Sequence, residues 1–171
     1  DQGHPMHTFD LNKVNGSTIV VKKSDGKEKI LCLDGIERST DKDHLLIYDK
    51  NKPIAIAGII GSENSCVDET TTDILIESAY FDPVTIRKGA KKLDLSTDAS
   101  KRFERDTDID NLIDSMNMLC SLIQDISGGE VLKGIYDVYP NPKNNNKINF
   151  KVDNCNNLLG TNLTVSEVKS I

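Results

Sequence analysis

A nine-residue stretch gathers the side chains best suited to recognise a polar ligand. The segment 97–105, with the sequence TDASKRFER, holds two arginines, two acids and a helix-start signal. It begins twenty residues after Glu77, a single carboxylate that ends the apolar run Ile74–Ile76. An acid at the end of an apolar strand, near a capped helix, could hold a polar group of a substrate. Glu77 is therefore the sharpest candidate, although the residues alone favour an ordinary solvated strand end.

Other side chains capable of chemistry form no familiar catalytic motif. The chain has no G-x-S-x-G nucleophile elbow, no P-loop and no H-E-x-x-H helix. His4 and His7 have H-x-x-H spacing, but Pro5 between them favours a turn or an extended segment, and no third ligand is near in sequence. We therefore expect no metal site, and we expect His7 either to form hydrogen bonds in a pocket or to pin its loop to the sheet. His44 is expected at the surface.

The bulk composition limits the class of protein. A chain of 171 residues with 37% hydrophobic residues can bury a core of its own. The formal net charge of −6 argues against a general nucleic-acid coat, because affinity for phosphates comes mainly from Lys and Arg, and no DNA partner is expected. No apolar run approaches the roughly 18 residues of a membrane span, so no membrane partner is expected either. The four cysteines are far apart and indicate reduced thiols in a cytoplasmic protein.

The hydrophobic pattern predicts strands in the first half of the chain and helices after it. Strands are predicted at 18–21, 29–33, 45–48, 53–60 and 74–78, and a last one at 131–138. The turn signal Ser24-Asp25-Gly26 predicts that the first two strands form a hairpin, and the apolar run 53–60 predicts a central strand. Helices are predicted at 83–93, after Ser96 or Thr97, and at 109–126, the last of them ending at Gly128-Gly129. The expected fold class is α+β, a mixed, largely antiparallel sheet with packed helices.

Several motifs occur together in an order that resembles one family. They are His4-Pro5-Met6-His7-Thr8-Phe9-Asp10, Leu33-Asp34-Gly35, Ala57-Gly58-Ile59-Ile60-Gly61 and the segment 97–105. With Glu77, they make roughly residues 1–140 similar to the editing region of the beta subunit of bacterial phenylalanine–tRNA ligase. The chain departs from the usual pattern at Thr8 and Ser62, and at Asp106 and Ile109, where Gly and Pro are frequent.

The resemblance implies hydrolytic editing, the removal of tyrosine wrongly attached to the tRNA for phenylalanine. The matching glutamate of the family holds the substrate hydroxyl, which gives that role to Glu77, with the backbone N–H of Gly61 as its helper. Ala99 matches a small residue of the pocket floor, and Thr97 lines the pocket, caps its helix or does both. No side-chain nucleophile is implied. A water held near His7 and Thr97, with help from the ribose hydroxyls of the tRNA 3′ end, would attack the ester.

The resemblance also implies partners and domain organisation. The partners are the 3′ end of tRNA(Phe) carrying Tyr and an alpha subunit, in a heterotetramer. The parent enzyme uses ATP and Mg²⁺ on a different subunit, and no cofactor is expected in this chain. Residues 1–140 are the expected editing domain, 141–147 a Pro/Asn/Lys linker, and 148–171 the truncated start of the following beta-subunit module, with a strand at 148–152 and a helix opened by the capping box Thr164-x-x-Glu167. The abrupt start of the chain predicts a piece of a longer protein.

Three questions stay open at this point. The domain could be a tRNA-binding or subunit-packing module without editing activity. It could instead be a metal-dependent hydrolase in which His4, His7 and an acid bind the metal. Arg102 and Arg105 could contact phosphate or could anchor acids such as Glu104 and Asp106.

Overall fold

The chain folds into antiparallel strands with helices packed on them, which confirms the α+β prediction. The computed structural model describes residues 2–142 and 147–171. The strands are β1 (Met6–Asp10), β2 (Val20–Lys23), β3 (Lys29–Leu31), β4 (Glu37–Ser39), β5 (Leu45–Tyr48), β6 (Pro53–Ile56), β7 (Ile60–Gly61) and β8 (Ile74–Ser78). The helices are α1 (Pro83–Lys92), α2 (Asp98–Phe103), α3 (Leu112–Ser127), α4 (Val152–Leu159) and α5 (Val165–Ser170). Two compact units divide the chain, one ending at Val131 and the other running from Leu132 to Ile171.

The strands of the first unit form three antiparallel groups in place of one mixed sheet. The largest has the order β2-β5-β6-β7, and the others pair β1 with β8 and β3 with β4. The predicted hairpin of 18–21 with 29–33 is wrong, because β2 pairs with β5 and β3 pairs with β4. The turn at Ser24 exists, but the Ser24 N–H donates to the carbonyl of His44, which directs the two strands to different partners.

The core lies where β5 and β6 meet the first helices. The fully buried residues of these strands are Leu46, Ile47, Ile54 and Ile56. The run 53–60 was predicted as one central strand, and β6 is central, between β5 and β7. The run is broken by a turn at Gly58, whose φ is +65° and where a Cβ atom would lie 2.8 Å from the ring of Phe81. Only glycine meets both conditions without strain.

His44 lies in the core and not at the surface, so its predicted position is wrong. The side chain is 2% exposed, and its Nδ1 accepts a hydrogen bond from the backbone N–H of Asp41 at 3.0 Å. Because Nδ1 accepts, Nε2 carries the proton and donates to the carbonyl oxygen of Gly89 at 3.2 Å. Both ring nitrogens are therefore satisfied, which makes burial of an imidazole tolerable. The histidine ties the start of β5 to α1.

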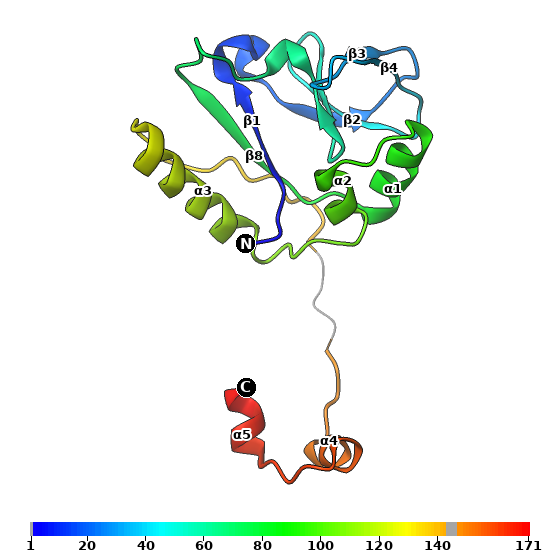
Figure 1. Cartoon of the computed structure of the whole chain (residues 1–171), viewed down its shortest axis with the longest axis vertical. Coiled ribbons are helices and arrows are strands. Elements are labelled where there is room, and N and C mark those ends of the chain that lie inside the picture. The colour runs from blue at the N-terminus through cyan, green and yellow to red at the C-terminus, as the bar shows by residue number, and fades with distance from the viewer. Residues whose placement is uncertain (1, 143–146) are drawn as a thin grey trace. The chain divides into compact units, whose positions relative to one another are not determined.

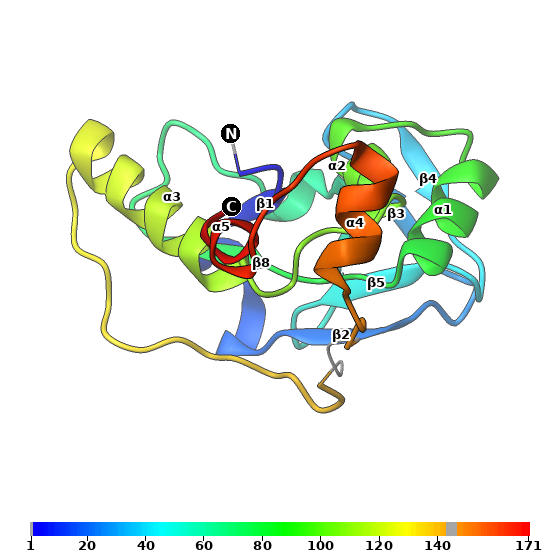
Figure 2. The same ribbon diagram turned by 90° about the horizontal axis from the view of Figure 1, so that it is seen from below.

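Local capping signals set the ends of the helices as predicted. The Asp82 carboxylate accepts from the N–H of Thr85 and opens α1 with Pro83 at its first position. The left-handed Gly128 ends α3, which begins at Leu112, three residues later than predicted. Figure 1 shows β1 and β8 side by side, with α3 on one side of this pair and α1 and α2 on the other, and Figure 2 shows the same order from below. The hydroxyl of Ser78 in β8 donates to the carbonyl oxygen of Leu112, which fixes the start of α3 on the strand.

Two strands predicted after α3 are absent from the described chain. Residues 131–138 are exposed and have no strand partner, and Lys151, within the predicted strand 148–152, immediately precedes α4. Both runs are rich in apolar residues, but a strand without a paired neighbour is not stable in water. Much of the predicted linker 141–147 falls on residues 143–146, outside the described residues.

The capping box of Thr164 and Glu167 is confirmed at the start of α5. Among the described residues, no helix is long and apolar enough to cross a membrane.

Replacing Asp106 by glycine should stabilise the first unit. Asp106 follows α2 and has a φ of +76°, a left-handed conformation that strains residues with a Cβ atom. Asp106→Gly should raise the free energy of unfolding by up to about 1 kcal/mol, because relief of strain exceeds the added chain entropy, whereas Asp106→Ala should lower it. Thermal unfolding followed by circular dichroism measures both. A shift of both variants in the same direction would contradict this account of the turn.

Candidate active site

An apolar cavity of about 240 Å³ lies in the first unit, between β1, β8, the turn after β6, and α2. All five residues predicted for the site line it: His7, Gly61, Glu77, Thr97 and Ala99. The remaining lining residues are largely apolar: Pro5, Met6, Leu33, Ile47, Ala55, Ile56, Gly58, Ile59, Ile60 and Phe103. A small apolar cavity with a few convergent polar groups is the usual form of a ligand site.

The pairing of β1 with β8 brings two of the polar residues together. His7 lies directly opposite Glu77 in the antiparallel register, although seventy residues separate them in sequence. Residues opposite each other in an antiparallel pair project to the same face. The imidazole and the carboxyl therefore share one face of this ladder, the face that lines the cavity.

The carboxyl of Glu77 is unusual because burial alone sets its acidity. The residue as a whole is half-buried, but its carboxyl group is buried, and loss of contact with water raises the pKa of that group to about 7. Within the described part of the chain, no ion pair or hydrogen bond compensates this burial. Near neutral pH, the group is therefore divided between a carboxylic acid and a carboxylate. Because the two protonation states are close in free energy near pH 7, the carboxyl can either donate a hydrogen bond to a ligand or accept one from it.

The ring of His7 lies against the backbone of Gly61. A Cβ atom at position 61 would be 2.6 Å from Cε1 and 2.8 Å from Nε2 of His7, so a larger residue there would displace the imidazole ring. Burial lowers the pKa of His7, which keeps the imidazole neutral near pH 7. The Nε2 atom is buried and has no hydrogen-bond partner among the described residues. It is therefore a buried polar atom that the described residues leave unsatisfied.

Gly61 lines the cavity, and its backbone is joined to the segment after β3. Its carbonyl oxygen accepts from the N–H of Leu33 at 3.1 Å. The N–H and the carbonyl of a strand residue point to the same side in an antiparallel ladder, so the Gly61 N–H also faces Leu33 and not β6. The role of the Gly61 N–H toward a ligand stays a prediction.

Thr97 both lines the cavity and holds α2 in place. Its Oγ1 donates to the carbonyl oxygen of Ile59 at 2.7 Å and accepts from the N–H of Ser100 at 3.0 Å. The Ser100 hydroxyl in turn accepts from the N–H of Thr97, completing a capping box. The hydroxyl of Thr97 has thus used its only proton, and one lone pair remains for a ligand.

Phe103 and Leu33 form walls of the cavity that residue-type reasoning did not single out. The ring of Phe103 is 3% exposed and lies 5.0 Å from the ring of Phe81, in an edge-to-face contact. Leu33 approaches from the segment after β3 and lies 3.0 Å from a Cβ atom built on Gly61. Both residues sit inside quoted motifs. The helical spacing of Ala99 and Phe103, four residues apart, is the signal that would have placed Phe103 on the same face.

Several other candidates lie outside this cavity. His4 is buried with its ring 6.0 Å from that of Phe103 and is not among the lining residues. Among the described residues, no group of three or more His, Cys, Asp or Glu side chains is placed to hold a metal ion. Arg102 and Arg105 do not line the cavity either; an amino group of Arg105 is 3.7 Å from the Glu104 carboxylate.

The comparison with known families agrees with the boundary of the first unit. Residues 1–128 match the family described as the B3/4 domain. The chain belongs to the B3/4 domain family. The match ends one residue after α3 and three residues before the unit ends at Val131. The cavity and all five predicted site residues therefore lie within the B3/4 match.

Curated relatives carry the comparison further. The phenylalanine–tRNA ligase beta subunit of Geobacter metallireducens is 44% identical over 171 residues, covering 100% of this chain and 21% of that protein. That of Protochlamydia amoebophila is 45% identical with the same coverage, and that of Fusobacterium nucleatum is 39% identical with the same coverage. The predicted resemblance to this beta subunit is confirmed. The chain spans about a fifth of the length of the curated relatives it matches.

Raising the pH should destabilise the B3/4 unit relative to the variant Glu77→Gln. The pKa of Glu77 is about 7 when folded and near 4.5 when unfolded, so the folded state binds more protons between these values. The free energy of unfolding then falls as pH rises through this window, by up to about 1.4 kcal/mol per pH unit. Glutamine cannot ionise. The melting temperature of the variant minus that of the wild type should therefore grow from pH 5 to pH 8.

The difference between the two chains isolates Glu77 from the other titrating groups. Burial lowers the pKa of His4 and of His7, so those residues favour folding as pH rises, but both chains contain them. Calorimetry at four pH values between 5 and 8 is sufficient. A constant difference across this range would show that Glu77 titrates as an ordinary exposed acid.

Proposed function

We propose that this chain edits aminoacyl-tRNA by hydrolysing tyrosine from tRNA(Phe). The single observation that carries the proposal is the uncompensated Glu77 carboxyl, with its pKa of about 7, in an otherwise apolar cavity. Such a group favours a ligand that is apolar apart from one hydroxyl. The side chain of tyrosine has this character. The curated relatives, named as phenylalanine–tRNA ligase beta subunits, support tRNA as the carrier of that ligand.

The size of the cavity suits one aromatic side chain. Its volume of about 240 Å³ exceeds the roughly 150 Å³ of an engineered cavity that admits benzene. Ala99 contributes only a methyl group to the wall from α2. The proposed pose places the ring against Phe103 and Ala99, with the phenol hydroxyl between Glu77 and the N–H of Gly61. The hydroxyl would donate to the carboxylate and accept from the backbone.

Selection for tyrosine over phenylalanine follows from the cost of leaving a buried acid unpaired. An apolar pocket that binds phenylalanine for attachment to tRNA rejects tyrosine, which has one added hydroxyl, only by about 100-fold. A second site that binds the hydroxyl can discriminate by roughly 10⁴ or more, because phenylalanine would leave Glu77 without a partner. The hydrogen bond to a charged acceptor adds to this preference, since charge-assisted bonds are about twice as strong as neutral ones.

Hydrolysis in this proposal needs orientation more than acid–base chemistry. The ester of an aminoacyl-tRNA is already reactive, so a water held in line with its carbonyl carbon gains most of the available acceleration from position. The buried Nε2 of neutral His7 and the remaining lone pair of Thr97 are the groups proposed to hold that water. The water attacks the carbonyl carbon, the bond to the ribose oxygen breaks, and free tyrosine and tRNA leave.

The remaining properties of the parent enzyme are also proposals. The chain would work as part of a cytoplasmic phenylalanine–tRNA ligase, a heterotetramer with an alpha subunit. ATP and Mg²⁺ would serve the synthetic site on that other subunit, and no cofactor is assigned to this chain. The alternative is a tRNA-binding or packing module that does not edit. The next two experiments separate these functions.

Replacing Glu77 by alanine should abolish the removal of tyrosine. In the assembled ligase containing this chain, Glu77→Ala should reduce deacylation of Tyr-tRNA(Phe) by at least about 100-fold, because the hydroxyl loses its acceptor. Release of labelled tyrosine measures this rate. Glu69→Ala, which alters an exposed acid of the loop before β8, is the matched control and should edit normally. Editing by the Glu77 variant at the wild-type rate would sink the assignment, and a wild type that does not deacylate would favour the packing module.

Enlarging Ala99 should block the cavity while leaving the fold intact. Ala99→Trp places an indole in the space proposed for the tyrosine ring and should prevent deacylation, at a cost of about 1–3 kcal/mol in stability. Ala99→Ser adds one atom and should retain most activity. Circular dichroism checks that the tryptophan variant is folded. Normal editing by a folded Ala99→Trp enzyme would mean that the substrate does not enter this cavity.

A further inference from the structure

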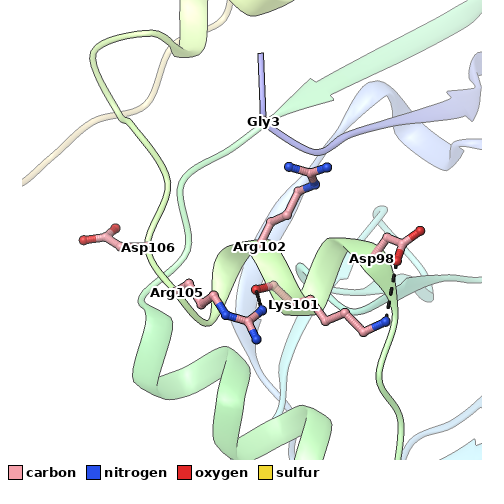
Figure 3. Close-up of a pocket in the computed structure, with 6 residues that line it drawn as sticks. All are labelled: Gly3, Asp98, Lys101, Arg102, Arg105 and Asp106. Atoms are coloured by element: carbon pink, nitrogen blue, oxygen red, sulfur yellow. Dashed lines mark hydrogen bonds and ion pairs between the residues drawn. The ribbon is translucent and has the colours of Figure 1, made fainter. Parts of the chain in front are cut away.

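A second cavity, of about 410 Å³, lies against α2 and the turn that follows it. Its lining residues are Gly3, Asp98, Lys101, Arg102, Arg105 and Asp106. Figure 3 shows the charged residues projecting from the helix and its turn, with Gly3 across from Arg102. The lining is cationic overall, with three basic side chains and two acids, in a chain whose formal net charge is −6.

The same short helix therefore borders two cavities of different character. Residues 98, 101 and 102 form one stripe of α2, and Arg105 lies in the turn after it; all four line the charged cavity. Ala99 and Phe103 form the neighbouring stripe and line the apolar cavity. A helix with its side chains is about 10–12 Å wide. A single extended ligand of about this length would therefore reach both cavities.

The basic side chains of this cavity form only weak ion pairs with the acids around them. Lys101 lies 3.6 Å from Asp98, whose side chain is 98% exposed, so solvent screens the pair. An amino group of Arg105 donates to the carbonyl oxygen of Lys101 at 2.6 Å, which fixes the guanidinium beside the end of α2. Asp106 points away from the other labelled side chains (Figure 3).

Arg102 is the side chain best placed to receive an anion. Its guanidinium extends toward Gly3 (Figure 3), and within the described residues it has no hydrogen bond or ion pair. A Cβ atom built on Gly3 would lie 3.6 Å from an amino group of Arg102, so a longer side chain at Gly3 would crowd the guanidinium. A planar guanidinium with free donors matches the oxygens of a phosphate in a two-bond arrangement.

We propose that this cavity binds backbone phosphates of the RNA strand whose 3′-terminal ester enters the apolar cavity, an inference that rests on the proposed function. The ester and the nearest phosphates of one strand are separated by a sugar unit or two, a span comparable with the helix that divides the cavities. Three cations spread along α2 and the turn after it suit successive phosphates better than one free anion. Arg102 is the principal contact, with Lys101 and Arg105 on either side.

The test removes these charges in the assembled ligase and measures deacylation of Tyr-tRNA(Phe) across a salt series. Arg102→Gln should raise the KM about fivefold at low salt and reduce the slope of log KM against log salt by about 0.7, the value per phosphate contact for a single strand. The combined variant Lys101→Gln, Arg102→Gln, Arg105→Gln should reduce the slope by about 2. Arg102→Lys, which keeps the charge, should recover most of the loss. Arg87→Gln, an exposed cation of α1 that lines neither cavity, is the control.

Each other outcome would overturn the proposal in a distinct way. An unchanged KM and salt slope in Arg102→Gln would show that no phosphate binds there. An equal rise in the KM for uncharged tRNA during phenylalanine attachment would indicate a general tRNA contact or a structural defect. Inhibition by inorganic phosphate at constant ionic strength, lost in Arg102→Gln while the tRNA KM stays the same, would assign the cavity to free phosphate. If the wild type does not deacylate, the proposed function fails, and equilibrium binding of uncharged tRNA to the same variants still decides whether the cavity holds phosphates.

Discussion

The antiparallel pairing of β1 with β8 is the contact on which the apolar cavity depends. Five residue pairs join Met6–Asp10 to Ile74–Ser78, and Phe9, 1% exposed, lies two residues from His7 on the same face. Burying a phenylalanine contributes about 1.5–3 kcal/mol, and a register shift of one residue would turn every side chain of the strand to the opposite face. The burial of Phe9 therefore also directs His7, and with it the opposed Glu77, toward the cavity.

The main energetic cost of this arrangement is the removal of the Glu77 carboxyl from water on folding. Burial without a partner raises the pKa of the carboxyl to about 7, which means that the folded chain disfavours the ionised form. A structural acid would normally be paired or solvated. Apolar burial elsewhere in the unit, such as that of Leu46 and Ile56, offsets this cost. Uncompensated polar groups of this kind are typical of functional sites and not of packing.

The helix α2 organises both cavities although it has only six residues. The hydroxyl of Thr97 holds its first turn to the carbonyl of Ile59, and Phe103 anchors its last turn against Phe81. With both ends held, the apolar stripe and the cationic stripe have fixed directions. The proposed roles of the two stripes are therefore linked. A ligand that spans α2 would contact the apolar stripe at one end and the basic side chains at the other.

The amino-acid sequence by itself determined the features that depend on local interactions. Helix ends were predictable at Asp82-Pro83, Thr97 and Thr164 because a cap forms hydrogen bonds within four residues. Glu77 and His7 were candidates from their residue types and positions, but the roles of the site residues, and the choice of Gly61 and Ala99, came from resemblance to a family. Tertiary structure decided which strands pair, so the hairpin of 18–21 with 29–33 and the strands at 131–138 and 148–152 were predicted wrongly, as was the exposure of His44. Only the folded chain brings Glu77 out of water and opposite His7, because pKa and strand register depend on residues distant in sequence.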